Sequence, residues 1–208
     1  MNINFIVTTY DKEEYRPYLV YIFKNYKKIN PTYSVIYTGN KLDFSANIKI
    51  ENRGHSRGDY DCMIHGYLNL KNKSQSTRYI KIGIDSWLLN EDKIIEIFNK
   101  MENESCGYAG IWWDSNKDDI STDIFFVDTR FGNIFESMIQ NDVPESLTHR
   151  LEVYMYQLLK FSNIKPYFIT ERWPTWSDFR WNCPALGWTM SHKLEENLNF
   201  LKKYNKYE

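Results

Sequence analysis

The segment RYIKIGID, residues 78–85, is mostly apolar and ends on a carboxylate. A short apolar run of this kind predicts a buried strand, Arg78–Ile84, with Asp85 directly at its end. In sheets built from parallel strands, ligands bind outside the carboxyl ends of the strands. Asp85 is therefore the first residue that we expect to face a ligand.

Strands and helices are expected to alternate on both sides of this segment. The other predicted strands are Ile3–Thr9, Tyr33–Thr38, Asn47–Glu51, Gly107–Trp113, Thr122–Asp128 and Pro166–Thr170. The predicted helices are Glu13–Lys28, Asp59–Leu70, Glu91–Met101, Asn133–Gln140, Leu147–Phe161 and a last one that Ser191 caps. This alternation predicts an α/β fold: a mainly parallel, Rossmann-like central sheet flanked by helices.

The bulk properties favour one soluble domain. The chain has 208 residues, of which 42% are apolar, and its net charge is −1. That length suits a single domain, and the charge balance disfavours a nucleic-acid partner. The three cysteines support neither a disulfide framework nor a zinc cluster, so a cytoplasmic setting is expected. No run approaches the ~18 apolar residues of a transmembrane helix, although peripheral membrane contact stays open.

Two further groups of polar residues are expected near Asp85. Thr8 and Tyr10 end the first strand and should share its edge of the sheet. In the polar, glycine-containing loop Asn52–Gly58, Arg53 and Arg57 could pair with phosphate oxygens or contact a nucleoside. A solvated loop with surface arginines is the alternative. The next residue, Asp59, could cap a helix or accept a ribose hydroxyl.

Candidate metal ligands and bases carry their own alternatives. Asp85 could bind Mg²⁺ or Mn²⁺, which take carboxylate and phosphate oxygens, or it could cap the next turn. His192 could complete that metal site or be a surface histidine. Glu152, Asp123 and Asp114 could each act as a general base, and Glu152 could equally be a structural carboxylate.

Taken together, these segments resemble a compact glycosyltransferase of the GT-A type, such as the small viral and bacterial enzymes that decorate glycans. The order of the motifs is similar: residues 5–11 (FIVTTYD), residues 52–54 (NRG), residues 83–85 (GID) and then His192. The segment STDIFFVD, residues 121–128, also resembles the acceptor-side strand of that family. One departure is Gly83, which stands where the first aspartate of the family's Asp-x-Asp signature would be.

The resemblance implies a metal-assisted transfer of a sugar from a UDP- or GDP-sugar to a glycan or another hydroxyl acceptor. It implies a nucleotide-sugar half, residues 1–105, and an acceptor half, residues 106–208, within one domain. Asp85 and His192 would hold the metal, and Trp112, Trp113 and Trp176 would line the acceptor side. A sugar-nucleotidyltransferase and a non-catalytic glycan-binding module of degenerate transferase type remain the alternatives.

Overall fold

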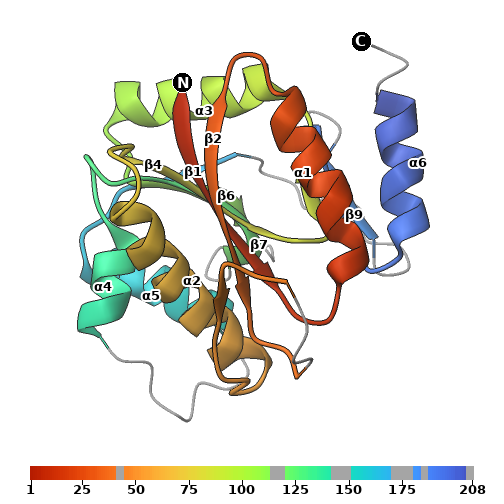
Figure 1. Ribbon diagram of the computed structural model, residues 1–208. Helices are drawn as coiled ribbons and strands as arrows, with labels where there is room; N and C mark the ends of the chain where they lie inside the picture. The colour runs from red at the N-terminus through yellow and green to blue at the C-terminus, as the bar shows by residue number, and fades with distance from the viewer. Residues whose placement is uncertain (41–44, 113–119, 142–150, 170–179, 184–186, 205–208) are drawn as a thin grey trace.

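A computed structural model describes residues 1–40, 45–112, 120–141, 151–169, 180–183 and 187–204 (Figure 1). Its strands are β1 (Asn2–Thr9), β2 (Asn30–Tyr37), β3 (Ile48–Lys49), β4 (Arg78–Gly83), β5 (Ser86–Leu88), β6 (Tyr108–Trp112), β7 (Ile120–Asp128), β8 (Pro166–Phe168), β9 (Arg180–Cys183) and β10 (Trp188–Ser191). Its helices are the 3₁₀ turn Glu13–Tyr15, α1 (Arg16–Asn25), α2 (His55–Lys71), α3 (Glu91–Glu104), α4 (Ile134–Gln140), α5 (Leu151–Phe161) and α6 (Leu194–Tyr204).

The central sheet has seven strands in the order β3-β2-β1-β4-β7-β6-β8. Strand β1 pairs in parallel with both β2 and β4, and β2 pairs in parallel with β3. Strand β7 runs antiparallel to both of its neighbours, whereas β6 and β8 are parallel. The predicted α/β fold with a mainly parallel, Rossmann-like sheet is confirmed.

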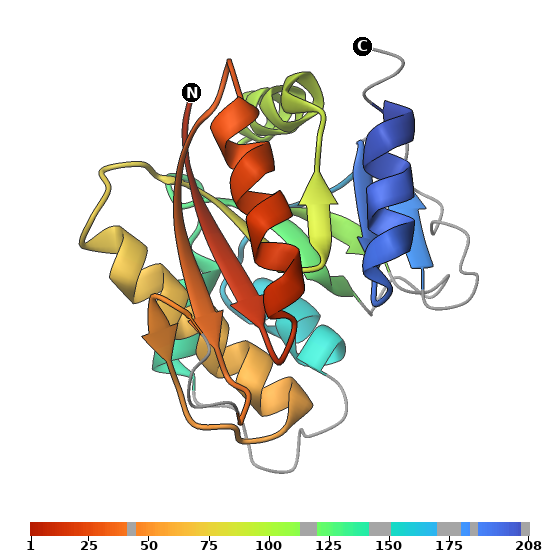
Figure 2. The ribbon, with the colours of Figure 1, turned by 45° about the vertical axis from the view of Figure 1, so that its right-hand side comes forward.

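Helices cover both faces of this sheet because its strands are apolar on both sides. Along β1, Phe5 and Val7 join a core with α1 and α3, whereas Ile6 joins a second core with α2, α4 and α5. Alternate side chains of a strand point to opposite faces, which accounts for this division. Figure 2 shows α1 lying along the sheet on one side and α2 on the other.

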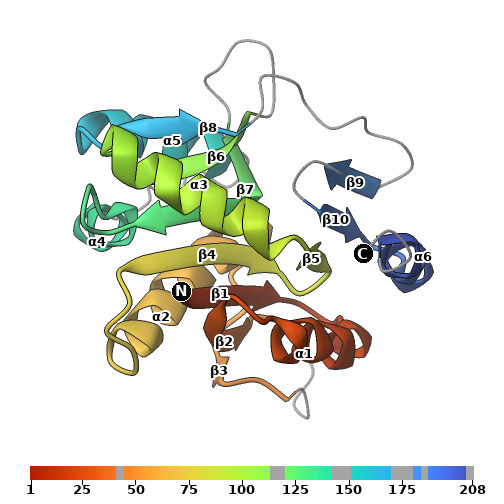
Figure 3. The same cartoon turned by 90° about the horizontal axis from the view of Figure 1, so that it is seen from above.

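A second, three-stranded sheet, in the order β5-β10-β9, was not predicted from the sequence. Strand β5 follows Asp85 directly, and β10 pairs with it in antiparallel fashion, Met190 opposite Ser86. Figure 3 shows β9 and β10 together with α6 to one side of the large sheet. This small sheet brings the C-terminal part of the chain to the end of β4.

The structure corrects two expectations about helix starts. Helix α2 begins at His55, so residues 55–58 form its first turn rather than part of a loop. Gly54, with a φ of 89°, turns the chain into this helix, a conformation that glycine adopts readily. The last helix begins at Leu194, because residues up to Ser191 belong to β10.

Within the described ranges, no helix is long and apolar enough to span a bilayer.

An ion pair between the buried Asp128 and the more exposed Arg130 stabilises the far end of β7. Asp128 has no exposed surface, and its carboxylate accepts hydrogen bonds from Arg130 Nη2 at 2.7 Å and Nε at 2.9 Å. Arg78 Nε lies 3.6 Å from the same carboxylate. Removing one charge from such a group leaves its partners uncompensated.

The substitution Asp128→Asn is therefore expected to lower the free energy of unfolding by about 2 kcal/mol, the scale of a hydrogen bond to a charged group. The matched control is Asp92→Asn, because Asp92 is 71% exposed in its pair with Lys28. The control should lower the free energy of unfolding by less than about 1 kcal/mol, because exposed ion pairs contribute little to stability. Urea unfolding at pH 7 measures both variants, and equal losses would show that burial of Asp128 does not matter.

Candidate active site

The ends of β1 and β4 form one edge of the sheet, as expected for parallel neighbours. Thr8 pairs with Gly83 across the two strands, and the Ile84 N–H donates to the Thr8 carbonyl at 2.9 Å. A cavity of about 230 Å³ opens at this edge. Its lining residues are Thr8, Thr9, Tyr10, Lys12, Asp59, Lys81, Gly83, Ile84, Asp85, Thr122, Asp123, Glu152, Met190 and His192.

Asp85 lines this cavity with only 6% of its surface exposed. Its Oδ2 lies 2.9 Å from His192 Nδ1 and forms an ion pair with Lys12. Burial by itself raises the pKa of Asp85, but the contact with His192 and the positive charge of Lys12 outweigh it and hold the pKa below its usual value. Asp85 is therefore a charged carboxylate in a largely dry position.

The main chain around Asp85 is held from the C-terminal part of the molecule. The Asp85 carbonyl accepts from Asn197 Nδ2 at 2.7 Å and from the Ser191 N–H at 3.4 Å. His192 follows Ser191 directly, so the pairing of β10 with β5 brings the imidazole to the carboxylate. The structure thus brings the two candidate metal ligands, Asp85 and His192, into contact.

Gly83 has a steric role beside Asp85. A Cβ atom at position 83 would lie 2.8 Å from Asp85 Oδ1, closer than such atoms approach. In this arrangement the Asp85 side chain uses the space that an aspartate at position 83 would need. The departure from the Asp-x-Asp pattern therefore fits the observed orientation of Asp85.

Asp123 lies near the start of β7 and faces the same cavity. Burial raises its pKa to about 6; Lys81 opposes the rise, while Asp59, Asp85 and Glu152 add to it. Glu152, in the first turn of α5, accepts a hydrogen bond from Thr122 Oγ1 at 3.4 Å. Asp114, the third predicted base, lies outside the described residues.

Lys81 is a buried cation that the sequence reasoning missed. Its side chain is 3% exposed, and Nζ donates to Asp59 Oδ2 at 2.9 Å and to the Thr122 carbonyl at 2.5 Å. Tyr79, two residues before it, packs against α2, and this period of two could have indicated that Lys81 meets Asp59. The Asp59 carboxylate is thus engaged by Lys81, although it still lines the cavity.

The two predicted arginines are not among the residues that line this cavity. Arg53 Nη1 and Arg57 Nε lie 3.3 Å and 3.2 Å from the carboxylate of Asp61. Thr8 and Tyr10 do line the cavity, and burial raises the pKa of Tyr10, with Asp59 contributing, so its hydroxyl stays protonated. The nucleotide-binding predictions for Arg53 and Arg57 therefore receive no support from the cavity.

The side chains of the predicted acceptor residues lie outside the part of the chain that the structure describes. Trp113 and Trp176 lie outside the described residues. Trp112 is the last residue of β6, and its side chain also lies outside what the structure describes.

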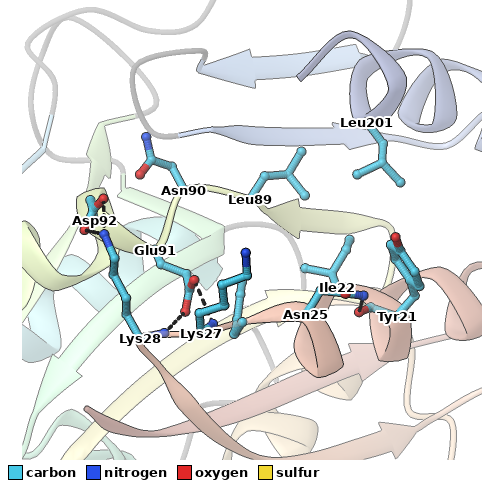
Figure 4. Close-up of a pocket in the computed structure, with 11 residues that line it drawn as sticks. Tyr21, Ile22, Asn25, Lys27, Lys28, Leu89, Asn90, Glu91, Asp92 and Leu201 are labelled. Carbon is cyan, nitrogen blue, oxygen red and sulfur yellow. Dashed lines mark hydrogen bonds and ion pairs between the residues drawn. The ribbon is translucent and has the colours of Figure 1, made fainter. Parts of the chain in front are cut away.

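A second cavity of about 440 Å³ lies at another place, between α1, the start of α3 and Leu201 of α6 (Figure 4). Three of its charged side chains, those of Glu91, Lys28 and Asp92, already bind groups of the protein itself. Glu91 accepts the backbone N–H groups of Lys28 and Ile29, both at 2.8 Å, and the Lys28 ammonium lies 2.7 Å from Asp92. The two carboxylates of this larger cavity are thus engaged in contacts that hold the protein together.

Asp85 and His192 offer one carboxylate oxygen and one imidazole nitrogen to a cation. Across the part of the chain that the structure describes, no three His, Cys, Asp or Glu side chains converge as a closed metal site. Mg²⁺ and Mn²⁺ do not require one, since they bind through one or two carboxylates together with water and substrate phosphates. The pair therefore fits a divalent cation that arrives with a phosphate-bearing ligand.

No protein-family model matches the chain, and no curated protein matches it in sequence. Similarity to solved structures shows that the fold is that of GT-A-type glycosyltransferases. One such structure is the mannosyltransferase PcManGT from Pyrobaculum calidifontis in complex with GDP-Man and Mn²⁺, at 8% identity and a TM-score of 0.51. The match covers 80% of this chain and 54% of that enzyme, so the chain spans about half of its length.

Two other structures extend the comparison. A glycosyltransferase involved in glycosylation of the major capsid of PBCV-1 matches at 12% identity and a TM-score of 0.52, over 81% of each chain. TarS of S. aureus, residues 1–349 in complex with UDP, matches at 11% identity and a TM-score of 0.51, over 83% of this chain and 59% of that one. At these identities the likeness concerns the fold alone.

Proposed function

We propose that the chain is a glycosyltransferase that moves a sugar from a nucleoside-diphosphate sugar to a hydroxyl group of a glycan acceptor. The observation that carries the proposal is the set of polar residues that line one cavity at the ends of β1 and β4. It joins the charged Asp85 carboxylate and its neighbour His192 to a second carboxylate, Asp123, whose pKa is shifted towards neutrality. PcManGT and TarS, which share the fold, are described with GDP-Man and Mn²⁺ and with UDP.

The charges of the cavity favour a metal-assisted donor. Four carboxylates line it, those of Asp59, Asp85, Asp123 and Glu152, against the ammonium groups of Lys12 and Lys81. A diphosphate would add negative charge to a lining that is already acidic. A bound Mn²⁺ or Mg²⁺, held by Asp85 and His192, would neutralise the diphosphate as a leaving group.

The remaining roles follow from position. A cavity of about 230 Å³ is smaller than the ~300–1,000 Å³ typical of small-molecule sites, so the proposal places the sugar and diphosphate inside and the nucleoside along the rim at Thr8 and Tyr10. The Lys81–Asp59 pair would fix the wall between α2 and β4. Trp112, Trp113 and Trp176 are proposed for the acceptor side.

Asp123 is the proposed base. The acceptor oxygen forms a bond to the anomeric carbon, the bond from that carbon to the diphosphate oxygen breaks, and the hydroxyl proton passes to Asp123. A base works best when its pKa lies near the working pH, and the pKa of about 6 meets that condition. Glu152, which accepts a hydrogen bond from Thr122 Oγ1, is the rival base.

The rate of transfer should depend on pH in one direction. Asp123 can accept a proton only when it is ionised, so kcat should rise as pH increases through about 6 and level off above it. Initial rates between pH 4.5 and 8.5, at saturating donor and acceptor, measure this profile. A rate that falls across pH 5–7 would contradict the assignment.

Ligand binding tests the function itself. Thermal unfolding is followed with a panel of UDP- and GDP-sugars, each with and without Mn²⁺. The expected result is a higher midpoint with at least one nucleotide sugar, larger when Mn²⁺ is present, because a ligand of the folded state stabilises it. Release of the nucleoside diphosphate on addition of a glycan acceptor then establishes transfer.

The released product and the ligands that bind separate the alternatives. A sugar-nucleotidyltransferase would instead release pyrophosphate from a nucleoside triphosphate and a sugar phosphate. A non-catalytic glycan-binding module would bind a glycan and no nucleotide, and that result would refute the proposal.

A further inference from the structure

Lys12 occupies the space between the two proposed metal ligands. It lies just after β1, at the start of the 3₁₀ turn, and its side chain is 28% exposed. Its ammonium forms an ion pair with Asp85 Oδ2 and lies 2.6 Å from His192 Nδ1. A residue that the sequence analysis did not single out thus contacts both ligands at once.

The geometry of the three groups resembles that of two ligands around one cation. A lysine ammonium has only donors, so the His192 nitrogen that faces it must accept. The same nitrogen lies 2.9 Å from Asp85 Oδ2, and its role towards that oxygen depends on which ring nitrogen carries the proton; in the tautomer that accepts from Lys12 it presents a lone pair. The lone pairs of the carboxylate and the imidazole therefore converge on Nζ, where a metal ion would otherwise lie.

We propose that the Lys12 ammonium is the resident cation of the Asp85–His192 pair, and that a divalent cation binds there only by displacing it. Lysine and metal compete for the same two lone pairs, so each excludes the other. The flexible stem of Lys12 allows the ammonium to leave without a change in β1.

This exchange regulates the proposed reaction. A free divalent cation must replace an existing ion pair and so binds weakly by itself. A cation that arrives with a diphosphate gives the displaced ammonium a new anionic partner. This second step rests on the proposed function, whereas the competition between Lys12 and the metal does not.

The test measures binding of Mn²⁺ alone, with no nucleotide present, from the electron paramagnetic resonance signal of the free ion. The variants Lys12→Met and Lys12→Gln are expected to bind Mn²⁺ about tenfold more tightly than the wild type, since a competing charge is gone. Lys193→Met is the matched control. It removes an equal charge next to His192, but Lys193 Nζ lies 3.8 Å from Glu196 and is 65% exposed.

The control should leave Mn²⁺ affinity within about twofold of the wild type, because exposed charges are screened. Adding Asp85→Asn to Lys12→Met should abolish the gain. Near-ultraviolet circular dichroism checks that each variant is folded. Wild-type affinity in both Lys12 variants, or a gain that survives Asp85→Asn, would overturn the proposal. If no variant binds any nucleotide sugar while the Mn²⁺ gain is present, the proposed function fails and the exchange stands.

Discussion

Replacement of Asp123 by asparagine is expected to lower kcat by about 10²- to 10⁴-fold, the range over which a positioned base contributes. Asparagine has nearly the same shape but cannot take the acceptor proton. The donor should bind as before, because the loss concerns the reacting hydroxyl rather than the diphosphate. Steady-state rates and donor affinity, measured on the same preparation, separate the two effects.

Two further variants make this result specific. Glu152→Gln removes the rival carboxylate and should reduce kcat far less. Asp61→Asn, whose carboxylate pairs with Arg53 and Arg57 away from the cavity, should leave kcat unchanged. If Glu152→Gln abolishes transfer and Asp123→Asn does not, Glu152 is the base.

The stability of the Asp123 variant supplies an independent control. The folded-state pKa of about 6 lies above the ordinary 3.8, so the folded protein binds this proton more tightly than the unfolded chain. The stability that this proton adds is complete below pH 3.8 and is lost as the pH rises through about 6. The wild type should therefore lose stability over that window relative to Asp123→Asn, which has no such group.

The second large effect is expected for Asp85→Asn. Without this carboxylate, no cation would neutralise the charge of the diphosphate leaving group, so kcat should fall by a hundredfold or more. Metal stabilisation of a leaving group contributes several kcal/mol, and about 2.7 kcal/mol corresponds to ~100-fold in rate. The dependence of activity on Mn²⁺ or Mg²⁺ should weaken at the same time. Metal titrations of initial rate measure both quantities.

His192→Ala provides the partner measurement. If Asp85 and His192 hold one cation, the double variant should lose little more than the worse single variant, because interacting residues are not additive. Full activity and an unchanged metal requirement in Asp85→Asn would remove the metal role from this residue.

Much of this edge of the sheet could be predicted from the sequence. Parallel neighbouring strands end at the same edge, so an apolar run that ends on Asp85 and another that ends near Thr8 and Tyr10 had to bring these residues together. Asp123 was singled out because the predicted strand began at Thr122, whereas β7 begins at Ile120 and carries Asp123 inside it. These inferences need only strand position and direction, and short apolar runs carry that information.

The rest depended on contacts between distant segments. Strands β5, β9 and β10 have three or four residues each, too few to show a period, so the small sheet was not predicted. The place of His192 came from the resemblance to GT-A enzymes. Lys12 was not predicted as a site residue, because a polar residue after a strand ordinarily lies in solvent. Its contact with His192 depends on the position of β10, which was not predicted either.

Because β10 pairs with β5, local unfolding of the C-terminal segment would separate His192 from Asp85 and so take the site apart. The contact between Asp85 and His192 closes a loop of about a hundred residues, and closing such a loop costs conformational entropy. The short strands of the small sheet hold this loop closed. Segments with few buried contacts unfold locally before the rest of the protein does. Ligands that bridge Asp85 and His192 should therefore slow amide hydrogen exchange in β10 and α6 more than in the seven-stranded sheet.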